Sequence, residues 1–227
     1  MGARIGLVIF DCDGVLVDSE MLACGVEARA LTATGYPITT AEVAHRYAGV
    51  SDADMRRAIE RESGRTLPED HAARCAAELE DVFRRELRAV QGIAAIVDAV
   101  TASGPQACVA SSSSPERLRL ALGLTGLWER FAPHVFSAKM VARGKPAPDL
   151  FLLAAREKAV EQAACLVVED SAPGIRAARA AGMTAIGFTG GSHCGPGHDA
   201  RLREAGAELV CVDARALGVL LRDLLGG

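Results

Sequence analysis

Short apolar runs alternate with amphipathic segments through most of the chain. Six runs have the length and composition of buried strands: Arg4–Phe10, Gln106–Ala110, His134–Ser137, Cys165–Val168, Thr184–Phe188 and Glu208–Val212. Helical patterns lie between the later runs, at about Pro115–Leu122, Asp149–Ala159, Pro173–Ala181 and Arg215–Leu225. This alternation of strand and helix predicts a parallel sheet that is covered by helices on both faces.

The stretch from about Ser19 to Arg88 has a different pattern. Alanine, leucine and charged residues alternate there, with breaks at Thr34–Pro37, Gly49–Asp52 and Gly64–Pro68. The pattern predicts four helices with no strand between them. We therefore expect an α/β fold, a doubly wound parallel sheet built from residues 1–16 and 89–227, with residues 17–88 inserted as an all-helical domain.

Composition narrows the class of protein. Of the 227 residues 50% are hydrophobic but only 4% aromatic, so the core is expected to be mainly aliphatic. The net charge of −4, without a long basic run, argues against nucleic acid or an anionic membrane as partner. The apolar run Gly6–Phe10 is too short for a membrane span, and it ends in Asp11 rather than in the small-residue cleavage site of a signal peptide. The seven cysteines lack paired spacing. We expect reduced thiols in a cytoplasmic protein, and nothing in the sequence requires more than a monomer.

Polar side chains follow four of the predicted strands. They are Asp11–Asp13, Ser111–Ser114, Glu169–Asp170 and Gly190–Ser192. Parallel α/β sheets place their sites at the carboxyl ends of the strands, where the strand order switches. The sequence therefore predicts that four carboxylates and a group of serines share one edge of the sheet.

Asp11 and Asp13 are two positions apart at the end of a strand, so both carboxylates would face one side if the extended geometry persists. Gly14 would then allow the chain to turn away. The simpler interpretation is that the two aspartates cap a turn.

Glu169 and Asp170 would bring the cluster to four negative charges, which is unfavourable unless a cation neutralises them. Oxygen ligands of this kind suit Mg²⁺, so Asp11, Asp13, Glu169 and Asp170 are the candidate metal ligands. Asp170 or Ser171 could also cap the helix that begins near Pro173, which is compatible with metal binding.

Ser111 and Ser112 open a run of four serines before Pro115, where a helix N-terminus could hold phosphate. A cap and loop is the plainer interpretation of the serines alone. Lys145 is one of only three lysines in a chain rich in arginine, which suggests that a compact ammonium is needed there. An exposed loop lysine is the alternative.

With these residues in place, the chain resembles the haloacid dehalogenase-like superfamily, in the branch of β-phosphoglucomutase and sugar-phosphate phosphatases with a helical cap. Four motifs carry the resemblance in order: Phe10–Glu20, Val109–Ser112, Lys145–Asp149 and Val168–Ser171. The stretch from Pro173 to Met183 also resembles the family. A lone Asp-x-Asp is weak evidence, but four ordered motifs are specific.

The resemblance implies a phosphatase with Asp11 as nucleophile and an aspartyl-phosphate intermediate. Asp13 would act as general acid and base. Ser111, Ser112 and nearby backbone N–H groups would hold the phosphoryl oxygens, and Lys145 would bridge Asp11 and the phosphate. Mg²⁺ would be held by Asp11, the carbonyl oxygen of Asp13 and Asp170, with help from Glu169.

The resemblance also implies that the helical insertion is a mobile cap, with hinges near Val15–Ser19 and Arg88–Gly92. The segment Tyr47–Asp52, with Gly49, Val50 and Ser51, would be its substrate-facing turn. A plain connection between helices, with Ser51 as N-cap, is an equally good interpretation.

A phosphosugar mutase is the nearest alternative function. Hydrolysis is favoured because Ala23 stands where the mutase has a histidine, and Asp52 where it has an arginine. Dehalogenase chemistry is disfavoured because Asp13 is the acid/base that phosphoryl transfer needs. A non-catalytic Mg²⁺- and phosphate-binding module is a third possibility. The expected substrate is a small phosphate ester, a sugar phosphate by default or a phosphorylated sugar acid.

The segment Ser192–His198 contains two histidines and one cysteine, which would suggest zinc. Three soft ligands at this spacing fit no structural zinc pattern. We therefore expect a glycine- and proline-rich loop that borders the phosphate site and shapes its entrance.

Overall fold

The computed structural model describes residues 4–47 and 52–225, which form two compact units. One unit comprises the chain up to Asp18 and again from Arg88 onward, and the other comprises Ser19–Leu87. The helical segment is thus inserted into the α/β unit after its first strand, and each unit is described by itself below.

The α/β unit is built on a six-stranded sheet in which every pair of neighbouring strands is parallel. The strands are β1 Leu7–Phe10, β2 Gln106–Ser111, β3 Val135–Ser137, β4 Cys165–Glu169, β5 Thr184–Phe188 and β6 Leu209–Cys211. Their order across the sheet is β3-β2-β1-β4-β5-β6. The predicted fold class, a doubly wound parallel sheet, is confirmed.

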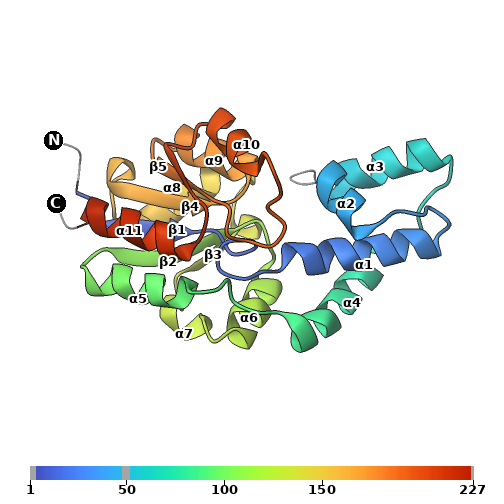
Figure 1. The fold of residues 1–227 in the computed structure, drawn as a ribbon, viewed down its shortest axis with the longest axis horizontal. Coiled ribbons are helices and arrows are strands. Elements are labelled where there is room, and N and C mark those ends of the chain that lie inside the picture. The colour runs from blue at the N-terminus through green and yellow to red at the C-terminus, as the bar shows by residue number, and fades with distance from the viewer. Residues whose placement is uncertain (1–3, 48–51, 226–227) are drawn as a thin grey trace. The chain divides into compact units, whose positions relative to one another are not determined.

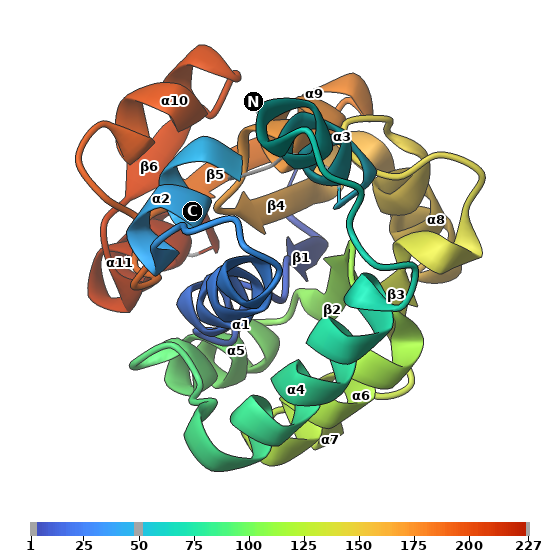
Figure 2. The ribbon, with the colours of Figure 1, turned by 90° about the vertical axis from the view of Figure 1, so that its right-hand side faces the viewer.

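Helices cover both faces of this sheet (Figures 1 and 2). On one face lie α8 Asp149–Glu157, α9 Ala172–Ala180 and α10 His198–Glu204. On the other lie α5 Ile93–Ala102, α6 Pro115–Leu124, α7 Trp128–Phe131 and α11 Ala214–Leu225. Two short 3₁₀ turns, η1 Ala138–Met140 and η2 Gln162–Ala164, complete the unit. The sequence pattern missed α5, α7 and α10.

The central strands are buried on both faces. Their sequences are therefore continuous apolar runs rather than alternations of apolar and polar residues. All four residues of β1 and all five of β4 are buried. The core between the sheet and helices α8 and α9 consists mainly of aliphatic and alanine side chains, with Phe136 and Phe151 among the few aromatic ones. The aliphatic core follows from a composition with few aromatic residues.

The helical unit contains α1 Glu20–Ala33, α2 Thr40–Tyr47, α3 Asp52–Ser63 and α4 His71–Glu86. It has a small apolar core of its own, made of Ala28, Leu31, Ile38, Val43, Ile59 and Leu67. A partly buried contact between Nε2 of His71 and Oε1 of Glu27, at 2.7 Å, joins α4 to α1.

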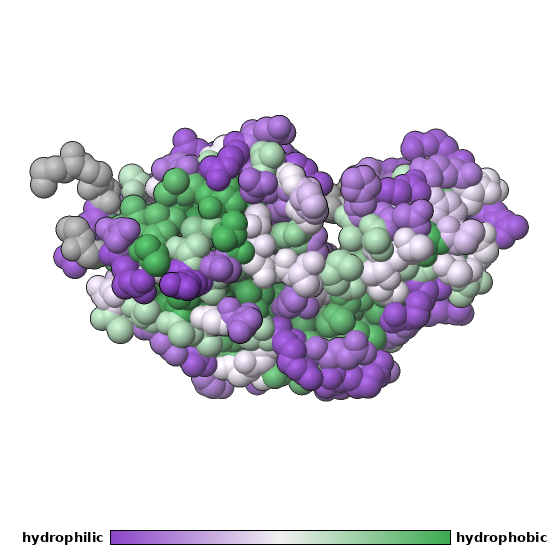
Figure 3. All heavy atoms as spheres, in the orientation of Figure 1, coloured by the Kyte–Doolittle hydropathy of each residue, from purple (hydrophilic) through white to green (hydrophobic). Residues whose placement is uncertain are grey.

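Hydrophobic residues reach the surface of the α/β unit in places (Figure 3). Leu209 of β6 and Val219 of α11 are among the exposed large apolar side chains. Within residues 4–47 and 52–225 no helix combines the length and the apolar character that a membrane crossing needs.

Candidate active site

The strand order places the site at the centre of the sheet. The chain leaves β1 toward β2 on one side and later returns to β4 on the other, so the order reverses between β1 and β4. Ligand sites of open α/β sheets lie at such a reversal, beyond the carboxyl ends of the strands. Asp11 follows β1 there, and its backbone N–H donates to the carbonyl oxygen of Val168 at 3.0 Å. Asp170 follows β4.

Lys145 connects the ends of three strands. Its Nζ donates to Oδ1 of Asp11 at 2.8 Å, to Oε1 of Glu169 at 2.5 Å and to the carbonyl oxygen of Ala110 at 3.0 Å. Only 4% of the side chain is exposed. Burial alone would lower the pKa of Lys145, but the carboxylates of Asp11 and Glu169 raise it above its ordinary value. The ammonium is therefore charged, and the alternative of an exposed loop lysine is wrong.

Glu169 is held from the other side by the start of α9. Its Oε2 accepts hydrogen bonds from the backbone N–H of Ser171 at 2.9 Å and from the Ser171 hydroxyl at 2.8 Å. The same hydroxyl accepts from the backbone N–H of Gly174 and so caps the helix. Both oxygens of Glu169 are therefore engaged, one with Lys145 and one with Ser171.

Gly174 is the position where a side chain would disturb this arrangement most directly, because a Cβ atom there would overlap the carboxylate of Glu169. We expect Gly174→Ala to lower the free energy of unfolding by about 1–3 kcal/mol, the usual cost of overpacking. Urea denaturation measures it. Gly123→Ala in α6 is the matched control, because its added Cβ meets nothing within 4 Å. Alanine there should stabilise by about 0.5–1 kcal/mol. Equal effects of the two substitutions would contradict this packing.

Asp11, Glu169 and Asp170 form a buried carboxylate cluster in which one oxygen of each lies within 4.8 Å of the others. Burial raises the pKa of Asp11 well above its ordinary value; Lys145 opposes this shift, while Glu169 and Asp170 add to it. Two cationic side chains, Lys145 and His193, contact these three acidic groups, so the cluster still lacks positive charge. A set of oxygen donors with this deficit fits a hard divalent cation such as Mg²⁺.

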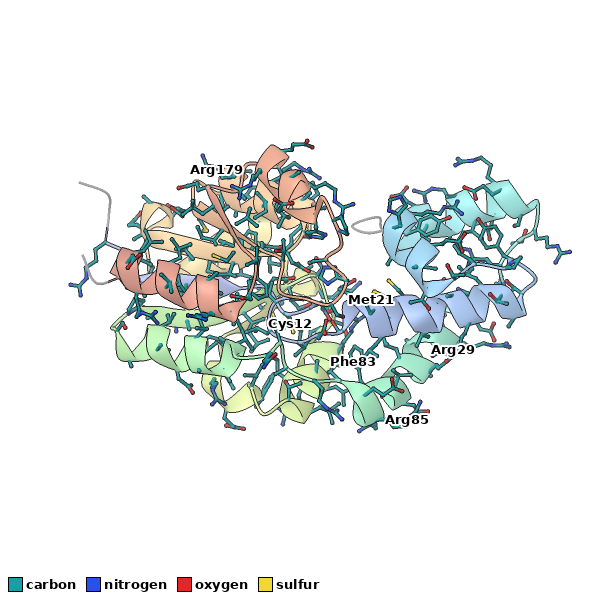
Figure 4. All side chains as sticks on the ribbon, viewed as in Figure 1. Cys12, Met21, Arg29, Phe83, Arg85 and Arg179 are labelled. Atoms are coloured by element: carbon teal, nitrogen blue, oxygen red, sulfur yellow. The ribbon has the colours of Figure 1, made fainter. Side chains whose placement is uncertain are left out.

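Asp13 does not join this cluster, which corrects the expectation of four clustered carboxylates among the described residues. The extended geometry ends at β1, because the backbone N–H groups of Leu16 and Val17 both donate to the carbonyl oxygen of Cys12 and form a turn. The turn begins at Cys12, which is labelled in Figure 4. Gly14 lies within the turn and has a φ of +80°. The side-chain alternation that would have paired Asp13 with Asp11 is lost there.

The carboxylate of Asp13 instead faces the end of β2 and the start of α6. Its Oδ2 accepts from the hydroxyl of Ser113 at 2.6 Å, and its Oδ1 accepts from the guanidinium of Arg117 at 3.3 Å. Neither Ser113 nor Arg117 stood out in the sequence as a partner of Asp13. Ser114 and Pro115 mark the start of a helix whose first turn lies at the edge of the sheet. This start signal in the sequence could have identified Arg117, which belongs to that first turn.

The serine run divides into separate roles. Ser111 is buried, and its hydroxyl accepts from the backbone N–H of Ser113 at 3.1 Å, whereas Ser112 is exposed. Ser114 caps α6 by accepting from the backbone N–H of Arg117. The cap interpretation is thus correct for Ser114. Phosphate binding by Ser111 and Ser112 stays a prediction.

The loop after β5 contacts the same site through Asp170. Nε2 of His193 lies 2.9 Å from Oδ2 of Asp170, and Nε2 of His198 lies 2.6 Å from the backbone oxygen of Asp170. Ser192 donates to Oδ1 of Asp18 from its backbone N–H and its hydroxyl, at 2.9 and 2.8 Å. Burial alone would lower the pKa of His193, but its hydrogen bonds to Asp170 and Cys194 raise it to about 11. The loop therefore borders the carboxylate cluster.

Three of the residues suggested for substrate binding, Gly49, Val50 and Ser51, lie outside the described residues. The residues that the structure brings together, Asp11, Lys145, Glu169 and Asp170, all belong to the α/β unit.

Comparison with known proteins decides the family. The model of the haloacid dehalogenase-like hydrolases matches residues 5–182, most of the chain. The chain belongs to this family. The match covers every residue of the carboxylate cluster as well as Lys145.

The haloacid dehalogenase-like chain has relatives over nearly its whole length. It is 31% identical to the 6-phosphogluconate phosphatase of Escherichia coli, over 86% of this chain and 87% of the relative. A conserved haloacid dehalogenase-like protein of unknown function from Agrobacterium tumefaciens has a TM-score of 0.88 and 40% identity, covering 97% of this chain and 99% of that one. A family hydrolase from Deinococcus radiodurans, with bound phosphate and sodium, has a TM-score of 0.81 and 29% identity and covers 98% and 97%. The resemblance and the enzyme class, a phosphatase, are confirmed.

Proposed function

We propose that this haloacid dehalogenase-like hydrolase is a Mg²⁺-dependent phosphatase that cleaves a small phosphomonoester through an aspartyl-phosphate intermediate on Asp11. The observation that carries the proposal is the buried Lys145 ammonium, which joins Asp11 to Glu169 while Asp170 completes a carboxylate cluster. The name of the Escherichia coli relative supports a sugar phosphate or phosphorylated sugar acid as the substrate class.

Mg²⁺ would be held by Asp11 and Asp170 together with the backbone oxygen of Asp13. Glu169 would add negative charge, although both its oxygens already accept hydrogen bonds. When bound, the ion supplies the positive charge that keeps Asp11 ionised and offsets the charge of the phosphoryl group. The pKa of Asp11, which burial raises well above its ordinary value, supports this need.

Asp11 acts as the nucleophile because Lys145 fixes its Oδ1 and leaves Oδ2 for attack. A bond forms between Oδ2 and phosphorus, and the bond from phosphorus to the ester oxygen breaks. Lys145 then lies beside the transferring group and offsets its charge. The serine end of β2 would hold the phosphoryl oxygens through Ser111 and Ser112.

Asp13 supplies the proton for the leaving alkoxide. In the second step it takes a proton from water, whose oxygen attacks phosphorus and releases inorganic phosphate from Asp11. Ser113 and Arg117 hold the Asp13 carboxylate in place, and both therefore orient the acid/base group. The helical insertion, residues 17–88, would supply the substrate specificity.

Turnover is expected to require a hard divalent ion and to release free phosphate. EDTA should abolish hydrolysis of p-nitrophenyl phosphate, and millimolar Mg²⁺ should restore it, because the carboxylate cluster lacks positive charge. With 6-phosphogluconate and hexose 1-phosphates, the assay should detect inorganic phosphate rather than an isomeric sugar phosphate. Isomer formation would favour the mutase, and a chain without turnover in millimolar Mg²⁺ would favour a binding module.

A further inference from the structure

A second group of ligand atoms lies beside the carboxylate cluster and consists of nitrogen and sulfur rather than oxygen. One such atom each of His193, Cys194 and His198 lies within 4.8 Å of the others. Sγ of Cys194 is 3.3 Å from Nε2 of His193, and the two imidazole rings meet edge to face with centroids 5.4 Å apart. Imidazole and thiolate are ligands that Zn²⁺ prefers and Mg²⁺ avoids.

His198 is already oriented as a metal-binding histidine is. Its Nε2 lies 2.6 Å from the backbone oxygen of Asp170 and donates its proton there, which leaves Nδ1 as the acceptor nitrogen of the ring. Metal-ligating histidines commonly donate their other N–H to a backbone carbonyl in this way. The guanidinium of Arg201 donates to Nδ1 at 3.0 Å, but Arg201 is exposed and can turn into solvent.

We propose that His193, Cys194 and His198 form an open, exchangeable binding site for Zn²⁺. Three protein ligands leave the fourth tetrahedral position to water, unlike the four-ligand sites that hold zinc structurally. The number and spacing of the three ligands fit no structural zinc site. They are compatible with an open site, because such a site needs only three protein ligands. On binding, a proton held by the Cys194 thiol or by a ligating imidazole nitrogen is released to solvent, and no oxidation state changes.

The zinc site has a consequence for the carboxylate cluster, and this step rests on the proposed function. His193 makes its contact with Asp170 through Nε2, the nitrogen that lies nearest the Cys194 sulfur. An ion bound to that nitrogen removes the hydrogen bond to Asp170 and places a second divalent charge beside it. Zn²⁺ is therefore expected to weaken the apparent affinity for Mg²⁺ and to inhibit turnover.

Cobalt spectroscopy tests the site without any need for turnover. The full chain, with its thiols reduced, is titrated with Co²⁺ in millimolar Mg²⁺, which fills the carboxylate cluster. We expect a near-ultraviolet thiolate-to-cobalt charge-transfer band, which one equivalent of Zn²⁺ removes. Cys194→Ser should abolish the band and weaken Zn²⁺ binding at least about tenfold, since even outer-shell changes cost 10–100-fold. Arg201→Met should strengthen binding, because it removes the competing guanidinium from Nδ1.

Cys75→Ser is the matched control. Cys75, His71 and Glu27 form the other thiol-containing group of potential ligands among the described residues. This variant should keep the cobalt band and the Zn²⁺ affinity. The proposal is overturned if the parent chain shows no thiolate band, if Cys194→Ser retains it, or if Cys75→Ser removes it. A chain that shows the band but hydrolyses no ester would overturn the phosphatase proposal and leave the zinc site standing.

Discussion

The Asp11→Asn variant should lose phosphatase activity by at least about 10⁴-fold, since removing one member of a catalytic triad costs about 10⁴–10⁶ in turnover. The amide has nearly the same shape as the carboxylate but cannot attack phosphorus. It also removes one negative charge beside Lys145, so the variant should fold at least as stably as the parent. Steady-state release of phosphate from the best substrate, in saturating Mg²⁺, measures the loss.

Asp98→Asn is the matched control for this change. Asp98 lies on α5 in the same unit, and its exposed carboxylate pairs with Arg130. Its loss should leave turnover within about twofold, because exposed ion pairs contribute little. An Asp11→Asn chain that kept a tenth of the parent activity would exclude Asp11 as the nucleophile.

The Lys145→Gln variant should lose both activity and stability. Turnover is expected to fall by about 10²–10³-fold, the usual cost of removing a positioned group that stabilises transition-state charge. Without Mg²⁺ the free energy of unfolding should fall by about 3–5 kcal/mol, because Asp11 and Glu169 would be left buried without a counter-charge. Lys145→Arg should not restore activity, since a planar guanidinium cannot make the three contacts of one compact ammonium.

Lys139→Gln is the control for Lys145, as a second of the chain's three lysines. Lys139 is exposed in η1, so its replacement should change neither turnover nor the urea midpoint. Added Mg²⁺ should restore part of the stability that Lys145→Gln loses, because the ion neutralises the same carboxylates. Equal stability of the Lys145 and Lys139 variants would show that the buried ammonium is not what balances the cluster.

The sheet could be predicted because its strands are buried on both faces. Continuous apolar runs such as Cys165–Val168, each ended by a polar pair, mark parallel strands directly. The same topology forces Asp11 and Glu169 to one edge, although 158 positions separate them in the sequence. Lys145 was harder to place, because a loop residue carries no periodic signal, and only its contacts show that it is buried.

The orientation of Asp13 could not be predicted in the same way. It depends on a turn that begins at Cys12 and on hydrogen bonds from Ser113 and Arg117, which lie about 100 positions away. The helix α5 was missed because Ile93–Ala102 is rich in β-branched residues and offers no cap: Gly92 precedes it without a side-chain hydrogen bond. α10 was missed because its start, at His198, lies within the glycine- and proline-rich segment.

The position of the loop that contains His193 and His198 could not be predicted from the local sequence. Glycines and prolines near His193 indicate an irregular segment, but not that the segment lies against Asp170. Gly14 makes this approach possible, because a Cβ atom there would overlap Oδ2 of Asp170. A close packing of this kind is a property of the folded sheet edge rather than of either segment.

The central claim is that a carboxylate oxygen of Asp11 becomes covalently bonded to phosphorus during turnover. Enzyme quenched in acid during steady-state hydrolysis of a ³²P-labelled phosphomonoester, then digested with trypsin, tests it directly. We predict hydroxylamine-labile label on the peptide from Ile5 to Arg29, located at Asp11 by fragmentation. Full hydrolytic activity with label on another residue, or with no labelled peptide at saturating substrate, would contradict the account.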